Sequence, residues 1–152
     1  MIRKATFKDI EKIHSLITNY SNQGKMLPRS LNSLFDNLRD FVVVIDDKTD
    51  NFIGCGALHI SWYELGEIKS LAVLEEYKRK GIGREIVKFL LEEAKKLHLK
   101  KVFALTYVPE FFIKLGFEKI DKNLLPHKIW SDCINCSKFP NCDEIAVIKI
   151  ID

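Results

Sequence analysis

Residues 71–84 predict an apolar strand, a short turn, and a glycine-bearing loop that opens directly into a long helix. Gly81 and Gly83 allow the backbone of this loop to approach a ligand closely. The first-turn N–H groups of the helix lack intrahelical partners, and the helix dipole favours an anion beside them. The run therefore predicts a strand–loop–helix unit that cradles a phosphate group.

The spacing of these glycines excludes two common phosphate loops. A Walker A loop needs four residues between its glycines and a Lys-Ser/Thr pair after the second, and a dinucleotide loop needs G-x-G-x-x-G. Lys78, Arg79, Lys80 and Arg84 crowd this loop with positive charge, whereas the net charge of the chain is only +3. We therefore place the basic excess at the loop and expect neither a nucleic-acid partner nor a membrane-surface helix.

The length of 152 residues fits one domain over residues 1–152, large enough to bury a core without disulfides. No apolar run approaches the ~20 residues that a membrane span needs, and the N-terminus leads into a strand rather than a secretion signal. We expect a cytoplasmic protein with no membrane partner. The oligomeric state stays open, with a homodimer as the alternative to a monomer.

Hydrophobic periodicity predicts the order of the elements. Strands are expected at residues 2–5, 41–46, 52–60, 64–73, 102–106, 117–120 and 145–150. Helices are expected from the Thr6-x-x-Asp9 start box to about residue 20, after the cap Ser30, over residues 81–98 and over residues 109–115. The expected core-facing residues are Ile10, Ile13, Leu16 and Ile17 in the first helix, Leu31, Leu34, Phe35 and Leu38 in the second, and Ile82, Ile86, Phe89, Leu90, Ala94 and Leu97 in the third.

Strands in a row followed by a strand–helix–strand crossover favour an α/β fold (α+β mixed), with a mixed central sheet of about six to seven strands and helices on both faces. This order, the loop Lys78-x-x-Gly81-x-Gly83 and the ending at residues 111–117, which is similar to F-Y-x-K-x-G-F, together resemble the GNAT acetyltransferases. The resemblance implies the GNAT fold over nearly the whole chain. It also implies acetyl-CoA as the co-substrate, with its pyrophosphate in the loop.

Three further segments resemble the small stand-alone bacterial GNATs regarded as N-acetylglutamate synthases: residues 26–30, Glu67 with residues 71–73, and residues 125–144. Those proteins catalyse the first step of arginine biosynthesis. The resemblance implies transfer of an acetyl group to the α-amino group of L-glutamate or L-glutamine. Two alternatives stay open: a GNAT that acetylates a protein N-terminus, lysine or polyamine, and a non-catalytic acetyl-CoA-binding module.

The resemblance assigns the cofactor contacts. It implies that the backbone N–H of Val73 donates a hydrogen bond to the acetyl oxygen. A preorganised donor of this kind contributes about 3 kcal/mol of transition-state stabilisation. Backbone groups of residues 71–73 should pair with the pantetheine arm as an added strand would. The predicted cofactor-binding residues are Leu71, Ala72, Val73, Arg79, Lys80, Gly81, Ile82, Gly83 and Arg84.

Glu67 occupies the position where the resemblance implies a general base, acting through water. An unperturbed glutamate with a pKa near ~4.3 is a poor base for an ammonium group, so a relay or a raised pKa would be needed. Taken alone, Glu67 is an ordinary solvated strand residue, and Glu64 is the alternative base. The thiolate normally takes its proton from a tyrosine at the place of Phe112, which leaves Thr106, Tyr107 or water as candidate donors.

Arg29 matches the arginine that binds the substrate α-carboxylate in the resembled synthases, with the Leu27 carbonyl near the amine. Bidentate pairing with a carboxylate is the physical reason for a guanidinium there, whereas a lone loop arginine is by default solvated. Lys69 and Thr106 complete the predicted substrate-binding set. Lys128 or His127 are second-choice contacts to the substrate side chain.

Cys133, Cys136 and Cys142 place three thiols within ten residues, with His127 nearby. Three thiolates and one histidine could complete a tetrahedral structural zinc site, and a cytosolic compartment argues against a disulfide. The paired second C-x-x-C is missing, however. Reduced cysteines that order an irregular loop are therefore favoured over zinc. Cys55 lies in a predicted strand and is expected in the core.

Overall fold

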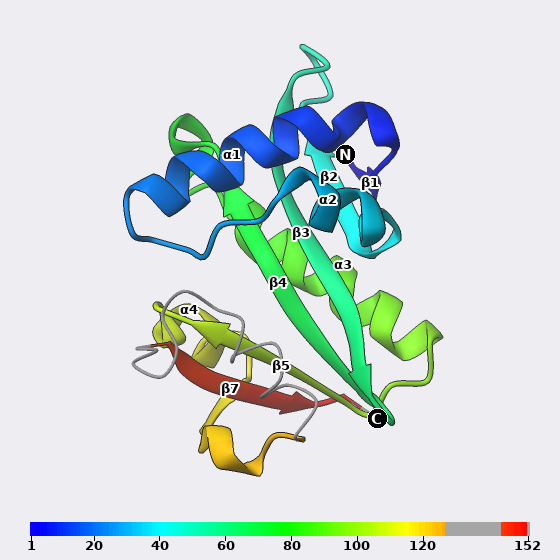
Figure 1. Cartoon of the computed structure of the whole chain (residues 1–152), viewed down its shortest axis with the longest axis vertical. Helices are drawn as coiled ribbons and strands as arrows, with labels where there is room; N and C mark the ends of the chain where they lie inside the picture. The colour runs from blue at the N-terminus through cyan, green and yellow to red at the C-terminus, as the bar shows by residue number, and fades with distance from the viewer. Residues whose placement is uncertain (127–143, 152) are drawn as a thin grey trace.

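The computed structural model describes residues 1–126 and 144–151, which form a seven-stranded sheet with helices on both faces (Figure 1). The strands lie in the order β1-β2-β3-β4-β5-β7-β6. β4 and β5 run parallel, and every other neighbouring pair is antiparallel. The predicted mixed sheet is confirmed.

The predicted elements are present, with ends that differ by a few residues. The strands are β1 (Ile2–Lys4), β2 (Phe41–Ile45), β3 (Phe52–Trp62), β4 (Leu65–Val73), β5 (Lys101–Thr106), β6 (Glu118–Ile120) and β7 (Ile145–Ile150). The α-helices are α1 (Ile10–Asn22), α2 (Leu31–Asp36), α3 (Ile82–Lys96) and α4 (Pro109–Ile113), and the short 3-10 helices are η1 (Phe7–Asp9), η2 (Leu38–Asp40), η3 (Glu75–Tyr77) and η4 (Lys122–Leu124). None of the helices in the described ranges is long and apolar enough to cross a membrane.

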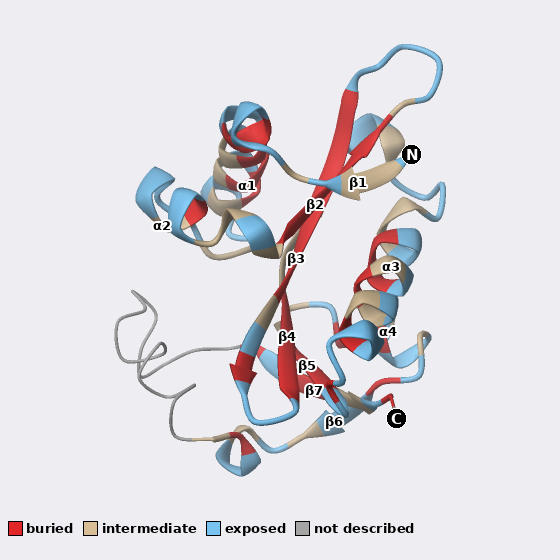
Figure 2. Ribbon diagram, turned by 90° about the vertical axis from the view of Figure 1, so that its right-hand side faces the viewer, coloured by how far each residue is buried: buried red, intermediate tan, exposed pale blue. Residues whose placement is uncertain are grey.

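The helices form two layers with the sheet between them: α1 and α2 cover one face, and α3 and α4 cover the other (Figure 2). Alternate residues of β2 pack against the two helical layers. Phe41, Val43 and Ile45 belong to the cluster that contains α1, whereas Val42 and Val44 pack with α3. All five residues are buried because both faces of this strand are covered.

The prediction for the core face of the second helix is wrong at two positions. Leu34 is buried and Leu38 is partly buried, but Leu31 and Phe35 are 44% and 57% exposed. The side of α2 that faces the core carries Leu34 and continues to Leu38 in η2, so Leu31 and Phe35 lie on the outer side of this six-residue helix. The predicted cap is confirmed, because the Ser30 side chain accepts a hydrogen bond from the Ser33 N–H.

The third helix also ends earlier than predicted, at Lys96. His98 adopts a left-handed backbone conformation (φ 62°), which turns the chain. As a result Leu97, which is predicted to face the core, is 49% exposed. Leu99 is buried in its place, at 6% exposed. Ile86, Leu90 and Ala94 are buried as predicted, and Ile82 and Phe89 pack partly buried against the same cluster.

Candidate active site

A cavity opens where β4 and β5 separate. The two strands pair at Leu65 with Lys101, at Gly66 with Val102 and at Glu67 with Phe103, and their pairing ends there. Figure 1 shows them starting side by side and then diverging. The cavity has a volume of about 690 Å³ and is lined by residues 25–30, 33, 67–71, 104–108, 111, 112 and 144. Six residues of the predicted site line it: Leu27, Arg29, Glu67, Lys69, Leu71 and Thr106.

A β-bulge in β4 shapes one wall of this cavity. β4 places Ser70 and Leu71 opposite the single β3 residue Gly56, because Cys55 pairs with Ala72 and Ala57 pairs with Lys69. Ser70 adopts a left-handed conformation (φ 55°), which a non-glycine residue takes rarely. The bulge re-aims the strand on its way to Val73.

Cys55 lies beneath this bulge and is fully buried, as predicted. Its Sγ donates a hydrogen bond to the Ser70 carbonyl oxygen at 3.4 Å. Burial raises the pKa of the Cys55 thiol to about 12, so the sulfur keeps its proton at neutral pH and acts as a donor.

Arg29 is fixed in the cavity wall by two hydroxyl groups. Its Nε and Nη2 donate to Ser33 Oγ at 3.2 and 2.8 Å, and its Nη1 donates to Ser70 Oγ at 3.2 Å. The guanidinium also stacks over the Phe41 ring, 5.3 Å from its centroid. Burial lowers the pKa of Arg29, while the nearby carboxylates of Asp40 and Glu67 act in the opposite direction. An arginine stays charged under such a shift, so the cavity wall carries a fixed cation.

Glu67 stands on β4 where the strands begin to diverge, and it is only 8% exposed. The interpretation of Glu67 as a solvated strand residue is therefore wrong. In the antiparallel register it lies opposite His59, whose Nδ1 is 2.6 Å from Asp40 Oδ2. The alternative base Glu64 lies outside the cavity lining, in an exposed turn where its Oε2 is 3.3 Å from Lys100 Nζ.

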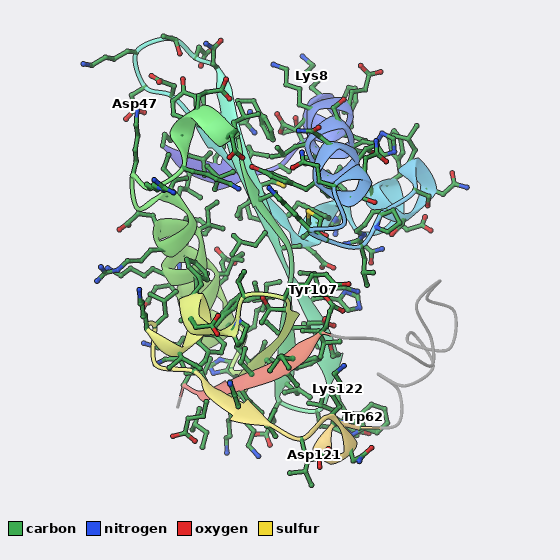
Figure 3. All side chains as sticks on the ribbon, turned by 90° about the vertical axis from the view of Figure 1, so that its left-hand side faces the viewer. Lys8, Asp47, Trp62, Tyr107, Asp121 and Lys122 are labelled. Atoms are coloured by element: carbon green, nitrogen blue, oxygen red, sulfur yellow. The ribbon has the colours of Figure 1, made fainter. Side chains whose placement is uncertain are left out.

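The candidate proton donors Thr106 and Tyr107 both line the cavity. Thr106 is buried, and its Oγ1 accepts a hydrogen bond from the Val108 N–H at 2.9 Å. Tyr107 lies near the middle of the molecule, away from the end marked by Trp62 (Figure 3). Phe112 is also in the lining and packs edge-on against Phe117, with 5.2 Å between ring centroids.

The peptide groups of Val73 face the open side of the sheet. Val73 lies opposite Gly54, and the next residue, Leu74, donates its N–H to the Ile53 carbonyl at 2.8 Å. In an antiparallel ladder this pattern makes Gly54 and Val73 a non-hydrogen-bonded pair, whose own N–H and C=O groups point away from each other's strand. The Val73 N–H therefore points to the side that β5 has left.

The basic loop lies at the start of α3. Arg79 and Gly81 adopt left-handed conformations (φ 66° and 80°), and α3 begins at Ile82 with no side-chain cap. A non-glycine residue in this conformation is strained, and such strain is concentrated at functional sites. The side chains of Arg79, Lys80 and Arg84 are exposed. The loop thus offers uncapped helix N–H groups and solvated cations together, as a phosphate site requires.

The polar cavity residues that sequence reasoning missed include Lys25, Ser33, Ser70 and Glu144. Ser33 carries a weak signal, since it follows three residues after the cap Ser30 on the helix next to Arg29. Ser70 has none, because a bulge depends on the partner strand. The predicted residues His127, Lys128, Cys133, Cys136 and Cys142 lie outside the described residues. Within residues 1–126 and 144–151, no group of three or more His, Cys, Asp or Glu side chains is arranged to hold a metal ion.

Known proteins share this sequence and architecture. Residues 7–117 match the acetyltransferase (GNAT) family. An amino-acid acetyltransferase of Mycobacterium tuberculosis is 38% identical over 154 residues, covering 100% of this chain and 84% of that protein. The crystal structure of Rv2747 from Mycobacterium tuberculosis, in complex with CoA and NLQ, has a TM-score of 0.87 at 28% identity and covers 100% of this chain and 99% of that chain.

A second solved structure is similar over part of its length. N-acetylglutamate synthase from Neisseria gonorrhoeae, complexed with coenzyme A and N-acetyl-glutamate, has a TM-score of 0.87 at 25% identity. The match covers 100% of this chain and 35% of that one. The sequence match, the full-length relative and the splayed sheet agree with the resemblance drawn from the sequence. The chain belongs to the acetyltransferase (GNAT) family.

Proposed function

We propose that this protein transfers the acetyl group of acetyl-CoA to the α-amino group of an amino acid, L-glutamate or L-glutamine. The observation that carries the proposal is the joint placement of Arg29 and Glu67 in one cavity at the divergence of β4 and β5. A fixed cation recognises a carboxylate, and a buried carboxylate next to it accepts a proton. An α-amino acid presents both groups that this pair requires.

Arg29 is the proposed carboxylate-binding residue. Its guanidinium has five N–H groups, and in the described structure three of them are directed to Ser33 and Ser70. One N–H then remains on each terminal nitrogen, which suffices for two hydrogen bonds to a carboxylate. Because the serines hold the guanidinium in place, little side-chain entropy is lost when the substrate binds.

Glu67 is the proposed general base and Val73 the proposed oxyanion donor. The protonated amine gives its first proton to Glu67, through water, and the neutral amine nitrogen attacks the thioester carbon. The electron pair of the C=O bond moves onto oxygen, where the Val73 N–H stabilises it. Collapse of this intermediate breaks the carbon–sulfur bond and expels the coenzyme A thiolate. The nitrogen loses its second proton, and Tyr107, Thr106 or water relays that proton to the thiolate.

The exposed loop at the start of α3 is the proposed pyrophosphate site. Uncapped N–H groups at the helix N-terminus would bind phosphate oxygens directly, and Arg79, Lys80 and Arg84 would add positive charge. β4 runs from the cavity toward this loop through Leu71, which lines the cavity, and then Ala72 and Val73, so the pantetheine arm would run along these residues. Acetyl-CoA would thus enter the cavity from the loop, with its acetyl group toward Glu67.

Glutamate and glutamine are preferred as acceptors for two reasons. Structures of this architecture bind coenzyme A together with N-acetyl-glutamate in Neisseria gonorrhoeae, and the Mycobacterium tuberculosis relative is an amino-acid acetyltransferase. In the cavity itself, Lys25 and Lys69 add positive charge beyond Arg29. A second carboxylate, or an amide oxygen, would find partners there. With glutamate as the acceptor, the reaction is the first step of arginine biosynthesis.

The test is a thiol-release assay of the purified protein with acetyl-CoA and each of the twenty amino acids. Glutamate or glutamine should have a kcat/KM at least about tenfold above every other amino acid, since each lost charged hydrogen bond costs about 1.5–3 kcal/mol. Spermidine and a lysine-bearing peptide serve as competing acceptors. Faster turnover of either one would replace the amino-acid assignment with acetylation of another amine.

A further inference from the structure

Tyr20, a buried residue in the last turn of α1, connects the cavity strand β4 with the basic loop of the proposed site. Its hydroxyl oxygen is 2.5 Å from the Val73 carbonyl oxygen and 3.1 Å from Glu75 Oε2. Lys78 Nζ lies 4.6 Å from the centre of the Tyr20 ring and 3.1 Å from the same Glu75 carboxylate oxygen. Four groups from three elements therefore meet at one point between the cavity strand and the basic loop.

The Val73 carbonyl oxygen is the main acceptor of the Tyr20 hydroxyl. A phenol has one proton to donate, and the contact with the Val73 carbonyl is much shorter than the contact with Glu75. Glu75 is paired mainly with Lys78, and the hydrogen bonds that it accepts from Lys78 and from Tyr20 lower the pKa of Glu75. Burial raises the pKa of Tyr20. The phenol thus stays neutral and keeps its donor at neutral pH.

The Val73 carbonyl needs such a partner because of where it points. In an extended residue the N–H and the C=O lie on the same side of the strand, and in Val73 both face away from β3. A bare carbonyl oxygen on that side would repel an oxyanion that develops next to the Val73 N–H. A hydroxyl donor on the carbonyl reduces this repulsion and fixes the orientation of the strand end.

We propose that Tyr20 is a positioning residue for acetyl transfer, which holds the Val73 carbonyl so that the Val73 N–H is presented to the acetyl oxygen. The proposal rests on the function proposed above. Lys78 supports the same arrangement. Its ammonium group binds Glu75 and lies over the Tyr20 ring, and it does not bind the pyrophosphate. Burial lowers the pKa of Lys78, but its hydrogen bonds to Glu75 and Tyr20 outweigh this and raise it.

The decisive measurement compares the affinities of acetyl-CoA and CoA, because only acetyl-CoA carries the oxygen that Val73 binds. Tyr20→Phe keeps the ring and removes the hydroxyl. In this variant the ratio of acetyl-CoA to CoA affinity, measured by calorimetry, should fall about fivefold, as expected for the weakening of one hydrogen bond. The kcat should fall about tenfold, and the amino-acid KM should stay within about twofold. Tyr63→Phe is the matched control, because the Tyr63 side chain is 84% exposed.

A purely structural role predicts a different outcome. Loss of packing would lower the melting temperature and the active fraction, but it would leave the affinity ratio unchanged, and an unchanged ratio overturns the proposal. The binding measurement uses no acceptor, so it stands even if no amino acid is acetylated and the proposed function fails.

Lys78→Met gives a second test at a partly exposed side chain, which also serves if Tyr20→Phe does not fold. If Lys78 binds Glu75 and not the pyrophosphate, Lys78→Met should lower the ratio of acetyl-CoA to CoA affinity. The affinity for CoA itself should stay within about twofold of wild type. An equal, larger loss of CoA and acetyl-CoA affinity would instead make Lys78 a pyrophosphate ligand and contradict its assignment to this arrangement.

Discussion

The cavity wall and the basic loop are arranged in opposite ways to bind their proposed ligands. In the cavity wall, Glu67 is buried and Arg29 is half-buried, and two serine hydroxyls fix the arginine. In the loop, Arg79, Lys80 and Arg84 are exposed, and the structure is set by backbone conformation and an uncapped helix start. The cavity wall relies on preorganised side chains, whereas the loop relies on main-chain N–H groups and exposed cationic side chains.

This difference follows from the two kinds of ligand. A small amino acid offers few atoms, so its recognition depends on a few desolvated, well-aligned contacts, each with a large effect. A pyrophosphate carries several oxygens and can bind many N–H groups at once, so no single cation is essential. Single substitutions should therefore be severe in the cavity wall and mild in the loop.

The largest effect is expected for Glu67→Gln, which keeps the shape and removes the proton acceptor. At neutral pH kcat should fall by about 10² or more, within the usual range for general base catalysis, while both substrates still bind. The deficit should shrink as pH rises toward the pKa of the amine, because more acceptor is then already deprotonated. Stopped-flow rates of the chemical step give the measurement, with Glu64→Gln in the exposed turn as the control. A near wild-type rate would remove Glu67 from the mechanism.

The next effect concerns Arg29. Arg29→Ala should raise the amino-acid KM about 30-fold or more, because the substrate carboxylate loses its charged hydrogen-bonded partner. The KM of acetyl-CoA should stay nearly constant, because Arg29 does not bind that substrate. Arg29→Lys keeps the charge without the fork, so it should show an intermediate loss. The exposed Arg39→Ala provides the control in steady-state kinetics. Equal increases in both KM values would show that Arg29 supports the fold of the site rather than one substrate.

A backbone substitution should have the largest effect within the loop. Gly83 lies in the first turn of α3, and a β-carbon there would already contact the Phe111 ring at 3.4 Å. Gly83→Val should raise the dissociation constant of acetyl-CoA about tenfold, because branched methyl groups obstruct the approach of phosphate to the helix N–H groups. Glu92→Val is the control, because it introduces the same branched side chain at an exposed position of α3. Unchanged binding in Gly83→Val by calorimetry would refute the pyrophosphate cradle.

The smallest effect is expected for one loop cation. Lys80→Gln should weaken acetyl-CoA binding by about threefold, and the difference from wild type should shrink further in high salt, since exposed charges are screened over about 10 Å. Titrations at two ionic strengths measure both quantities, with Lys96→Gln at the far end of α3 as the control. A salt-insensitive loss of tenfold or more would mean that Lys80 makes a fixed contact, and the contrast between the two regions would then disappear.

Local patterns in the sequence determined most of the fold. Periodicity and caps placed the strands and helices, because hydrogen bonding within a helix and alternation along a strand depend on neighbouring residues. The glycine loop was predictable for the same reason. Errors arose in which face a helix buries and in where a helix ends: α2 faces the core with Leu34 and leaves Leu31 and Phe35 exposed, and the left-handed turn at His98 places Leu99 in the core instead of Leu97.

The tertiary structure alone decided how the site is assembled. Arg29 carries no signal that it lies against Ser70, since the Ser70 hydroxyl reaches it from a strand 41 positions further along the chain. The bulge that presents Ser70 depends on the register between β3 and β4, and the cavity depends on β5 leaving β4 after Glu67. The contact between Tyr20 and Val73 spans 53 positions. A sequence specifies such contacts only through the packing of all its elements, so local physical chemistry predicts the residue types of this site but not their partners.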